Sequence, residues 1–167
     1  MPADVLVRPA RPEDYEAAGD ITVAAYASIE GFSPGPRYEA EMRDVAARVE
    51  TAEVLVAAAP DGRIVGAVTF VPGLGPLAEF EGADESGMRM LAVDPAAQGL
   101  GVGRMLAQAC LERARATERS RLVLHTTRAM TAAHALYRSL GFARTPGRDF
   151  HTPGGLVLEA YVYELSG

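Results

Sequence analysis

Amphipathic stretches alternate with short apolar runs along this chain, and the two patterns predict different elements. Apolar residues at helical spacing predict helices over residues 12–29, 38–49, 102–115 and 132–140. Compact or alternating apolar runs predict strands over residues 5–7, 54–59, 64–71, 88–93, 122–124, 142–144 and 156–165. The resulting order, β-α-α-β-β-β-α-β-α-β-β, is typical of an α/β (α+β) chain with a mixed central sheet flanked by helices.

Proline and glycine mark the turns between these elements. The turn residues Pro60, Asp61 and Gly62 predict a hairpin between the second and third strands. Gly31 is expected to end the first helix, and the Ser-Pro-Gly-Pro stretch at residues 33–36 is expected to forbid regular structure. The chain has 167 residues and no visible repeat or linker, so we expect residues 1–167 to form a single domain.

The basic residues change this picture, because all sixteen are Arg and the chain contains no Lys. Without Lys there is neither a Walker phosphate loop nor an amine nucleophile for a Schiff base. Cys110 is the single Cys and the three His are dispersed, so we expect no disulfide within the chain and no metal site. The net charge of −6 disfavours nucleic acid as a partner.

Targeting signals are not visible in the sequence. The first residues lack a basic segment followed by an apolar one, which is the pattern of a secretory signal. No apolar run approaches the ~18 residues of a membrane span. We therefore expect a cytoplasmic protein with no membrane partner.

The stretch after the strand at residues 88–93 carries the clearest chemical signal. Gly99, Gly101 and Gly103 separate this strand from an amphipathic helix. Free backbone N–H groups at a helix N-terminus form an anion site, and glycines let a phosphate approach the backbone closely. A tight turn without a ligand is the alternative. The dinucleotide-binding G-x-G-x-x-G pattern does not fit, because the third glycine comes one residue early.

Residues 98–103 (QGLGVG) resemble the Q/R-x-x-G-x-G/A motif of the GNAT superfamily of N-acetyltransferases. Residues 132–142 (AAHALYRSLGF) resemble the A-x-x-L-Y-x-x-x-G-F segment of the same family. The two motifs occur in the family's order, with a strand–helix–strand gap of suitable size. The resemblance implies the GNAT fold, with a mixed, mostly antiparallel central sheet, and acetyl-CoA as co-substrate.

The resemblance also implies where acetyl-CoA binds. In the family the glycine loop holds the pyrophosphate, and the preceding strand lies along the pantetheine arm and polarises the thioester carbonyl with an N–H group. The cleft is then expected between residues 88–93 and 122–124. The implied cofactor-binding residues are Leu91, Ala92, Val93, Gln98, Gly99, Leu100, Gly101, Val102, Gly103 and Arg104. Met130 replaces an Asn that contacts the cofactor in many relatives.

Tyr137 is the implied general acid, since the family places this tyrosine near the thioester sulfur and a phenol can protonate the leaving thiolate. Many relatives carry a catalytic Glu at the position of Gly87. Glu85, two residues earlier on the same strand face, is our predicted general base, with Glu81 or a water relay as alternatives. A solvated acidic loop over residues 79–85 is the other interpretation. If these acids line the acceptor cleft, they favour a cationic amine.

We therefore expect an acetyl-CoA-dependent N-acyltransferase in which a neutral primary amine attacks the thioester directly, without an acyl-enzyme. The acceptor is a small-molecule or peptide amine that the sequence does not identify, and a monomer and a homodimer both stay open. A non-catalytic acyl-CoA-binding sensor of the same fold is the alternative. Gly87 and Met130 favour the sensor, and Tyr137 opposes it.

Overall fold

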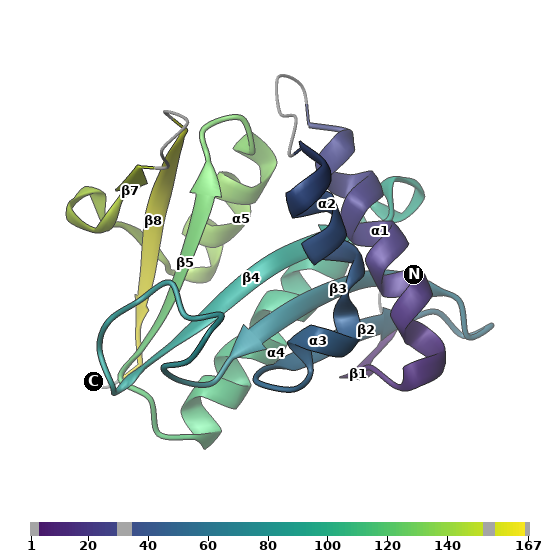
Figure 1. Cartoon of the computed structure of the whole chain (residues 1–167), viewed down its shortest axis with the longest axis horizontal. Coiled ribbons are helices and arrows are strands. Elements are labelled where there is room, and N and C mark those ends of the chain that lie inside the picture. Colours follow the sequence, from purple (N-terminus) through teal and green to yellow (C-terminus); the bar gives the residue numbers. More distant parts are fainter. Residues whose placement is uncertain (1–3, 30–34, 152–155, 166–167) are drawn as a thin grey trace.

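An eight-stranded sheet forms the centre of the fold in the residues that the computed structural model describes, 4–29, 35–151 and 156–165 (Figure 1). The strands pair in the order β1-β2-β3-β4-β5-β8-β6, and β7 also pairs with β8. Only the β4–β5 pair is parallel among these described strands, so the expected mixed, mostly antiparallel sheet is confirmed. The strands are β1 (Leu6–Pro9), β2 (Glu53–Ala58), β3 (Ile64–Val71), β4 (Glu85–Val93), β5 (Arg121–Thr127), β6 (Ala143–Arg144), β7 (Phe150–His151) and β8 (Val157–Glu164).

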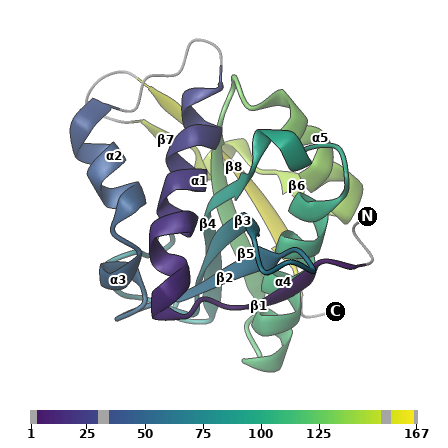
Figure 2. The ribbon, with the colours of Figure 1, turned by 90° about the vertical axis from the view of Figure 1, so that its right-hand side faces the viewer.

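Helices cover both faces of this sheet and give three layers, as Figure 2 shows. One face carries α1 (Tyr15–Ala27), α2 (Gly35–Arg43) and α3 (Val45–Arg48). The other face carries α4 (Val102–Ala116) and α5 (Thr131–Leu140). Short 3-10 turns precede α1 (Pro12–Asp14), follow β4 (η3, Pro95–Ala97) and follow β6 (η4, Pro146–Arg148).

The two faces of the central strands bury different apolar sets. Successive side chains of a strand point to opposite faces. In β2, Leu55 and Ala57 pack into the core beneath α4, whereas Val54 and Val56 pack into a second core beneath α1 and α3. A strand covered on both sides is apolar at nearly every position, which explains the unbroken apolar run that the sequence shows here.

The second predicted helix is divided in the structure. Asp44, with φ −85° and ψ 67°, ends α2 and caps α3, because its Oδ1 accepts a hydrogen bond from the N–H of Ala47 at 3.1 Å. This helical segment also begins at Gly35 instead of Tyr38, so the expectation of no regular structure is wrong at residues 35 and 36. Proline is tolerated in the first turn of a helix, where its missing N–H has no partner to lose. The other residues of that stretch, and Gly31, lie outside the described residues.

Two strands near the predicted site are longer than the sequence indicated. β4 begins at Glu85 instead of residue 88, and β5 extends to Thr127 instead of residue 124. The two-residue strand β7, which pairs with β8 at Leu158 and Val157, was not predicted. The extension of β4 includes Glu85. The prediction that Glu85 and Gly87 share one face of a strand required the strand to reach that far.

Candidate active site

β4 contains one residue more than β3 over the same span, and this irregularity shapes the site. Ala67 of β3 pairs with Ala92, but Thr69 pairs with Arg89. Met90 lies within the interrupted span, with φ of 56°, in the left-handed region that side chains other than Gly rarely adopt. Such a bulge bends the strand that carries it, and bulges are frequent beside active sites.

β4 and β5 separate next to this bulge. Their parallel pairing runs from Glu85–Arg121 to Met88–Leu124 and, in the described chain, goes no further. Beyond that point β4 stays paired with β3, and β5 stays paired with β8 as far as Thr127. Figure 1 shows the two strands diverging. Beyond Met88 and Leu124, the facing edges of β4 and β5 therefore carry backbone N–H and C=O groups that pair with no described strand.

A cavity of about 590 Å³ lies at this divergence. Its walls come from the end of β4, the glycine loop, the first turns of α4 and α5, and the C-terminal part of α1. It includes all of the predicted cofactor-binding residues except Leu100, whose side chain is 45% exposed. Met130 also lines the cavity, and its sulfur accepts a hydrogen bond from Thr126 Oγ1 at 3.1 Å.

The glycine loop has the donor set of an anion site. Gly99 and Gly101 have φ of 82° and 88°, which other residues adopt only with strain, and Gly101 is the N-cap of α4. The first N–H groups of this 15-residue helix have no intrahelical acceptor, and they lie at the positive end of its dipole. Arg104 lines the same cavity and donates a hydrogen bond to Ser139 Oγ at 2.5 Å, which links α4 to α5. These groups fit a phosphate ester.

Tyr137 is held in the core beside this cavity. Its side chain is 5% exposed and its ring packs against Phe142 and Tyr161, with ring centroids 5.7 and 6.0 Å away. Burial raises the pKa of the Tyr137 phenol well above its usual value, so the phenol keeps its proton at neutral pH. Tyr137 is absent from the cavity wall, whereas its neighbour Leu136 belongs to it.

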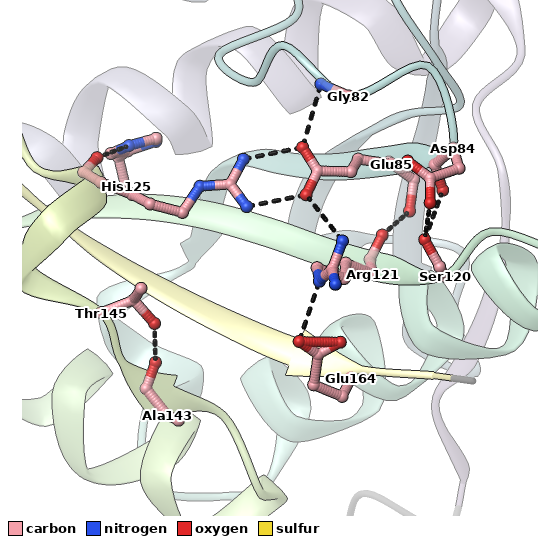
Figure 3. Close-up of polar contacts among 11 residues, drawn as sticks. Gly82, Asp84, Glu85, Ser120, Arg121, His125, Ala143, Thr145 and Glu164 are labelled. Atoms are coloured by element: carbon pink, nitrogen blue, oxygen red, sulfur yellow. Dashed lines mark hydrogen bonds and ion pairs between the residues drawn. The ribbon is translucent and has the colours of Figure 1, made fainter. Parts of the chain in front are cut away.

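Glu85 is fully engaged in ion pairs and hydrogen bonds (Figure 3). Its two oxygens each accept a hydrogen bond from the Arg148 guanidinium at 2.7 Å, and Oε1 also accepts one from the N–H of Gly82 at 3.1 Å. Arg121 lies 3.6 Å from Oε2, and the Glu85 side chain is only 4% exposed. The hydrogen bonds from Arg148 hold the pKa of Glu85 below its usual value despite burial. Glu85 therefore ties β4 to η4 as a stable anion, a state that disfavours taking up a proton.

The loop before β4 accounts for the absence of Glu at position 87. The ring of Phe80 covers Gly87, and a Cβ atom built on Gly87 would lie 2.7 Å from Phe80 Cε1. Phe80 is 7% exposed and packs with Val71, Val123 and Val162. The Phe80 ring thus fills the space that a side chain at position 87 would need.

Two of the four acidic residues at positions 79–85, Glu79 and Glu85, form ion pairs with Arg. Glu79 pairs with Arg89 at 3.3 Å, and Asp84 accepts a hydrogen bond from Ser120. Glu81, the alternative base, is exposed. Since Glu79 and Glu85 both have Arg partners, the loop gives little basis for the expected preference for a cationic amine.

The structure also bears on three further expectations, which concern the thiol, a metal site and a membrane span. Cys110 is buried in the core beneath α4, and burial raises the pKa of its thiol far above the usual value. No group of three or more His, Cys, Asp or Glu that could hold a metal ion occurs in the part of the chain that the structure describes. Across the same residues, no helix has the length and apolar character needed to span a membrane.

Sequence reasoning missed Arg89 and Arg48, which the structure brings together on the α1–α3 face of the sheet, the face that also carries Tyr26. Arg89 of β4 lies opposite Thr69 of β3, and Thr69 Oγ1 accepts a hydrogen bond from Arg48. Tyr26 of α1 lines the cavity. No local motif marks any of them, because each comes from a different element.

The sequence profile described as the Acetyltransferase (GNAT) family matches residues 20–142 of this chain. The chain belongs to this family. Family membership confirms the expected GNAT family and fold, and it supports acetyl-CoA as the co-substrate. The roles of individual site residues stay predictions.

Relatives of the GNAT chain include one curated protein and many solved structures. N-acetylaspartate synthetase from Xenopus tropicalis is 35% identical over 81 residues, which are 47% of this chain and only 30% of that protein. The structure of a GCN5-related N-acetyltransferase from Kribbella flavida is 24% identical, with a TM-score of 0.73 and coverage of 99% of this chain and 100% of that one.

Two other solved GNAT structures are similar over nearly the whole chain. The yncA protein of Salmonella typhimurium, solved with its cofactor acetyl-CoA, is 23% identical, with a TM-score of 0.73 and coverage of 98% of this chain and 95% of that one. Ribosomal-protein-alanine N-acetyltransferase from Brucella melitensis is 25% identical, with a TM-score of 0.72 and coverage of 96% and 99%.

Proposed function

We propose that this protein transfers the acetyl group of acetyl-CoA to a primary amine by direct attack of the neutral amine on the thioester, within a single domain formed by residues 1–167. The observation that carries the proposal is the joint position of the glycine loop and the unpaired edge of β4 in one cavity. A phosphate site next to a free strand edge suits a ligand that has a pyrophosphate at one end and amides along its arm.

The cofactor contacts follow from this arrangement. The backbone of residues 98–103 and the guanidinium of Arg104 hold the pyrophosphate in the proposed complex. The backbone groups of Leu91, Ala92 and Val93 pair with the pantetheine amides like an added strand, and an N–H group beside the bulge polarises the thioester carbonyl. Leu100 contributes only main-chain groups, which agrees with its exposed side chain.

The proton transfers are assigned to different groups. Tyr137, which keeps its proton at neutral pH, gives it to the departing thiolate, although burial makes the phenol a weaker acid. The ion pairs of Glu85 argue against its predicted role as base and support a positioning role through Arg148. Before the attack, the acceptor ammonium group loses one proton to water or to the exposed Glu81. The nitrogen loses a second proton to solvent as the amide forms, and solvent returns a proton to the Tyr137 phenolate. The buried Cys110 thiol supports a reaction without an acyl-enzyme.

The names of two relatives support a primary amine as the acceptor. One relative is named for acetylation of aspartate and another for acetylation of a protein alanine. Both groups are amines of amino-acid building blocks. A cytoplasmic location and the oligomeric state stay predictions.

Calorimetry with acetyl-CoA and a thiol-release assay with an amine library test the proposal. We expect binding of acetyl-CoA and turnover with at least one amine. The substitution Tyr137→Phe should lower kcat about 100-fold and leave the Kd for acetyl-CoA within about threefold. Tyr163→Phe is the matched control, since its hydroxyl accepts a hydrogen bond from Arg115 in the last turn of α4, at the opposite end of that helix from the glycine loop. An unchanged kcat would remove Tyr137 as the acid.

A non-catalytic acyl-CoA sensor is the second candidate. The observation in its favour is the Phe80 ring over Gly87, which fills the place of a catalytic carboxylate. Tight binding of acetyl-CoA without release of coenzyme A in the presence of any amine would favour the sensor over the transferase.

A further inference from the structure

Cationic side chains meet at the point where β4 leaves β5. Arg89 is the first β4 residue after the last β4–β5 pair, Met88 with Leu124. The cross-strand partner of Arg89 on β3 is Thr69, and cross-strand partners point to the same face of the sheet. Thr69 Oγ1 accepts a hydrogen bond from Arg48 of α3 at 3.1 Å. Arg89 and Arg48 therefore lie next to Thr69, on the face that α1–α3 cover.

Arg48 is a buried cation whose hydrogen-bond acceptors are neutral. It is 5% exposed, and besides Thr69 it donates to the carbonyl oxygens of Glu41 at 2.5 Å and Met42 at 3.1 Å. In the described part of the chain no carboxylate forms an ion pair with it. Burial and the charge of Arg89 lower the pKa of Arg48. A buried charge without a counter-ion is costly, so a nearby anion would be stabilised here.

Arg89 has one carboxylate partner, and that partner is more exposed than Arg89 itself. Its Nε lies 3.3 Å from Glu79 Oε1, and its Nη1 donates to the carbonyl of Leu77 at 3.4 Å. The side chain of Arg89 is 16% exposed and that of Glu79 is 36% exposed. A pair with an exposed carboxylate is weak, and a second carboxylate can join or replace Glu79. The two arginines together with Glu79 carry a net positive charge.

Two tyrosines connect this cation cluster, Arg48 and Arg89, to the cavity. Tyr26 of α1 lines the cavity, and its ring meets that of Tyr38 of α2 edge to face at 6.3 Å. Burial raises the pKa of Tyr38, whereas a hydrogen bond and the charge of Arg89 act in the opposite direction. The pKa of Tyr26 is likewise raised by burial and responds to Arg89. The contact between the Tyr26 and Tyr38 rings places α2 beside the α1 wall of the cavity, whereas Arg48 and Arg89 lie behind that wall and do not line the cavity.

We propose that Arg89, supported by the charge of Arg48, binds the carboxylate of the acceptor, and that the acceptors are amino acids instead of simple amines. The inference rests on the proposed transfer to a primary amine in this cavity. Arg89 follows the last β4–β5 pair and directly precedes Met90, beside which lies the backbone that is proposed to polarise the thioester. An α-amino acid carries its amine and its carboxylate on one carbon, so a carboxylate held by Arg89 keeps the amine within reach of the thioester.

The test compares matched acceptors on the unmodified protein. For a series of L-amino acids, each is assayed beside its amide and its decarboxylated amine by release of coenzyme A. We expect kcat/KM for the acid to exceed that for the amide and the amine by about 10- to 100-fold. Amino-acid amides have a lower amine pKa than the acids and hence more neutral amine, so the comparison with the amide is biased against the proposal and is the deciding one. Equal or better turnover of the amide or the amine refutes it.

The substitution Arg89→Gln adds a second readout. It should raise KM for the preferred amino acid about tenfold or more, leave kcat/KM for the matched amide nearly unchanged, and keep the Kd for acetyl-CoA. Arg63→Gln, an exposed arginine in the β2–β3 turn, is the charge-matched control and should change none of these values. If Arg89→Gln is unfolded by circular dichroism, the acceptor comparison decides alone. An equal loss with acid and amide refutes carboxylate binding.

The two proposals fail in different ways. Acetylation of amines without a preference for carboxylates refutes the role of Arg89 and leaves the transferase assignment intact. Absence of coenzyme A release with every acid, amide and amine contradicts the transfer itself.

Discussion

Replacing Glu85 by Gln removes a negative charge from the contact between β4 and η4. The wild-type carboxylate is 4% exposed, accepts two hydrogen bonds of 2.7 Å from Arg148 and one of 3.1 Å from Gly82. An amide has only one acceptor oxygen, so its N–H donors face a guanidinium that also donates. Removing one partner of a buried pair costs about 3–5 kcal/mol. Because Arg148 is 31% exposed and water replaces part of the lost contact, we expect a loss of about 2–3 kcal/mol.

Urea unfolding measures this loss, and Glu164→Gln is its control. Glu164 pairs with Arg121 at 2.8 Å but is 61% exposed, so its substitution should cost less than about 1 kcal/mol. For a chain of this size, a loss of about 2–3 kcal/mol lowers Tm by roughly 4–12 °C. A loss no larger than that of the control would refute the reasoning.

The same variant has a defined pH dependence. Arg148 lowers the pKa of folded Glu85, so the stabilisation is complete above the unfolded pKa of about 4.3 and is lost as pH falls through the lower folded value. The stability difference between wild type and Glu85→Gln should therefore shrink below about pH 4. A constant difference would contradict the ion pair as its source. If the low-pH limb of kcat/KM moves in this variant, Glu85 is the base after all.

Three further outcomes follow from the glycines and the cysteine. Gly99 and Gly62 have φ of 82° and 88°, so Gly99→Ala and Gly62→Ala should each lower stability by about 1–2 kcal/mol. Only Gly99→Ala should also raise the Kd for acetyl-CoA in calorimetry, by about tenfold. Equal Kd values for the two variants would contradict the loop's role. Gly87→Ala should cost about 1–3 kcal/mol in urea unfolding because its Cβ meets Phe80 at 2.7 Å, and a Phe80→Ala background should remove that cost; additive losses would exclude the ring as the obstacle. Cys110→Ala should retain kcat within about twofold in the thiol-release assay, whereas lost turnover with an intact fold would point to an acyl-enzyme.

Local sequence patterns were sufficient for most of the fold. The predicted strand at residues 64–71 coincides with β3, and the predicted helices at residues 102–115 and 132–140 correspond to α4 and α5. The apolar periodicity of each of these elements lies within its own residues, so the sequence alone was enough to predict it. The break at Asp44 was missed because an Asp in a charged helix looks like a solvated residue, and its cap is visible only once Ala47 is placed.

The site divides in the same way. The glycine loop was predictable because its residues are contiguous and their spacing is itself the signal. The partner of Glu85, Arg148, is 63 positions away, and Arg89 meets Arg48 only because β3 lies between β4 and α3. The extra residue at Met90 is defined by the register with β3, so no local pattern could show it. Contacts between distant elements therefore decide the acceptor side of the site.

The β4–β5 pairing is short, so a ligand bound beside it would add stability where the sheet has few hydrogen bonds. Four residue pairs hold the two parts of the sheet together along these strands. Acetyl-CoA bound between the separated parts of β4 and β5 would stabilise the folded state. A ligand that binds only the native state and is present at 100 times its Kd adds about 2.7 kcal/mol to the free energy of unfolding. The concentration of acetyl-CoA in the cell would then set how often β4 and β5 separate. It would thereby also set the rate at which the protein is degraded by proteases.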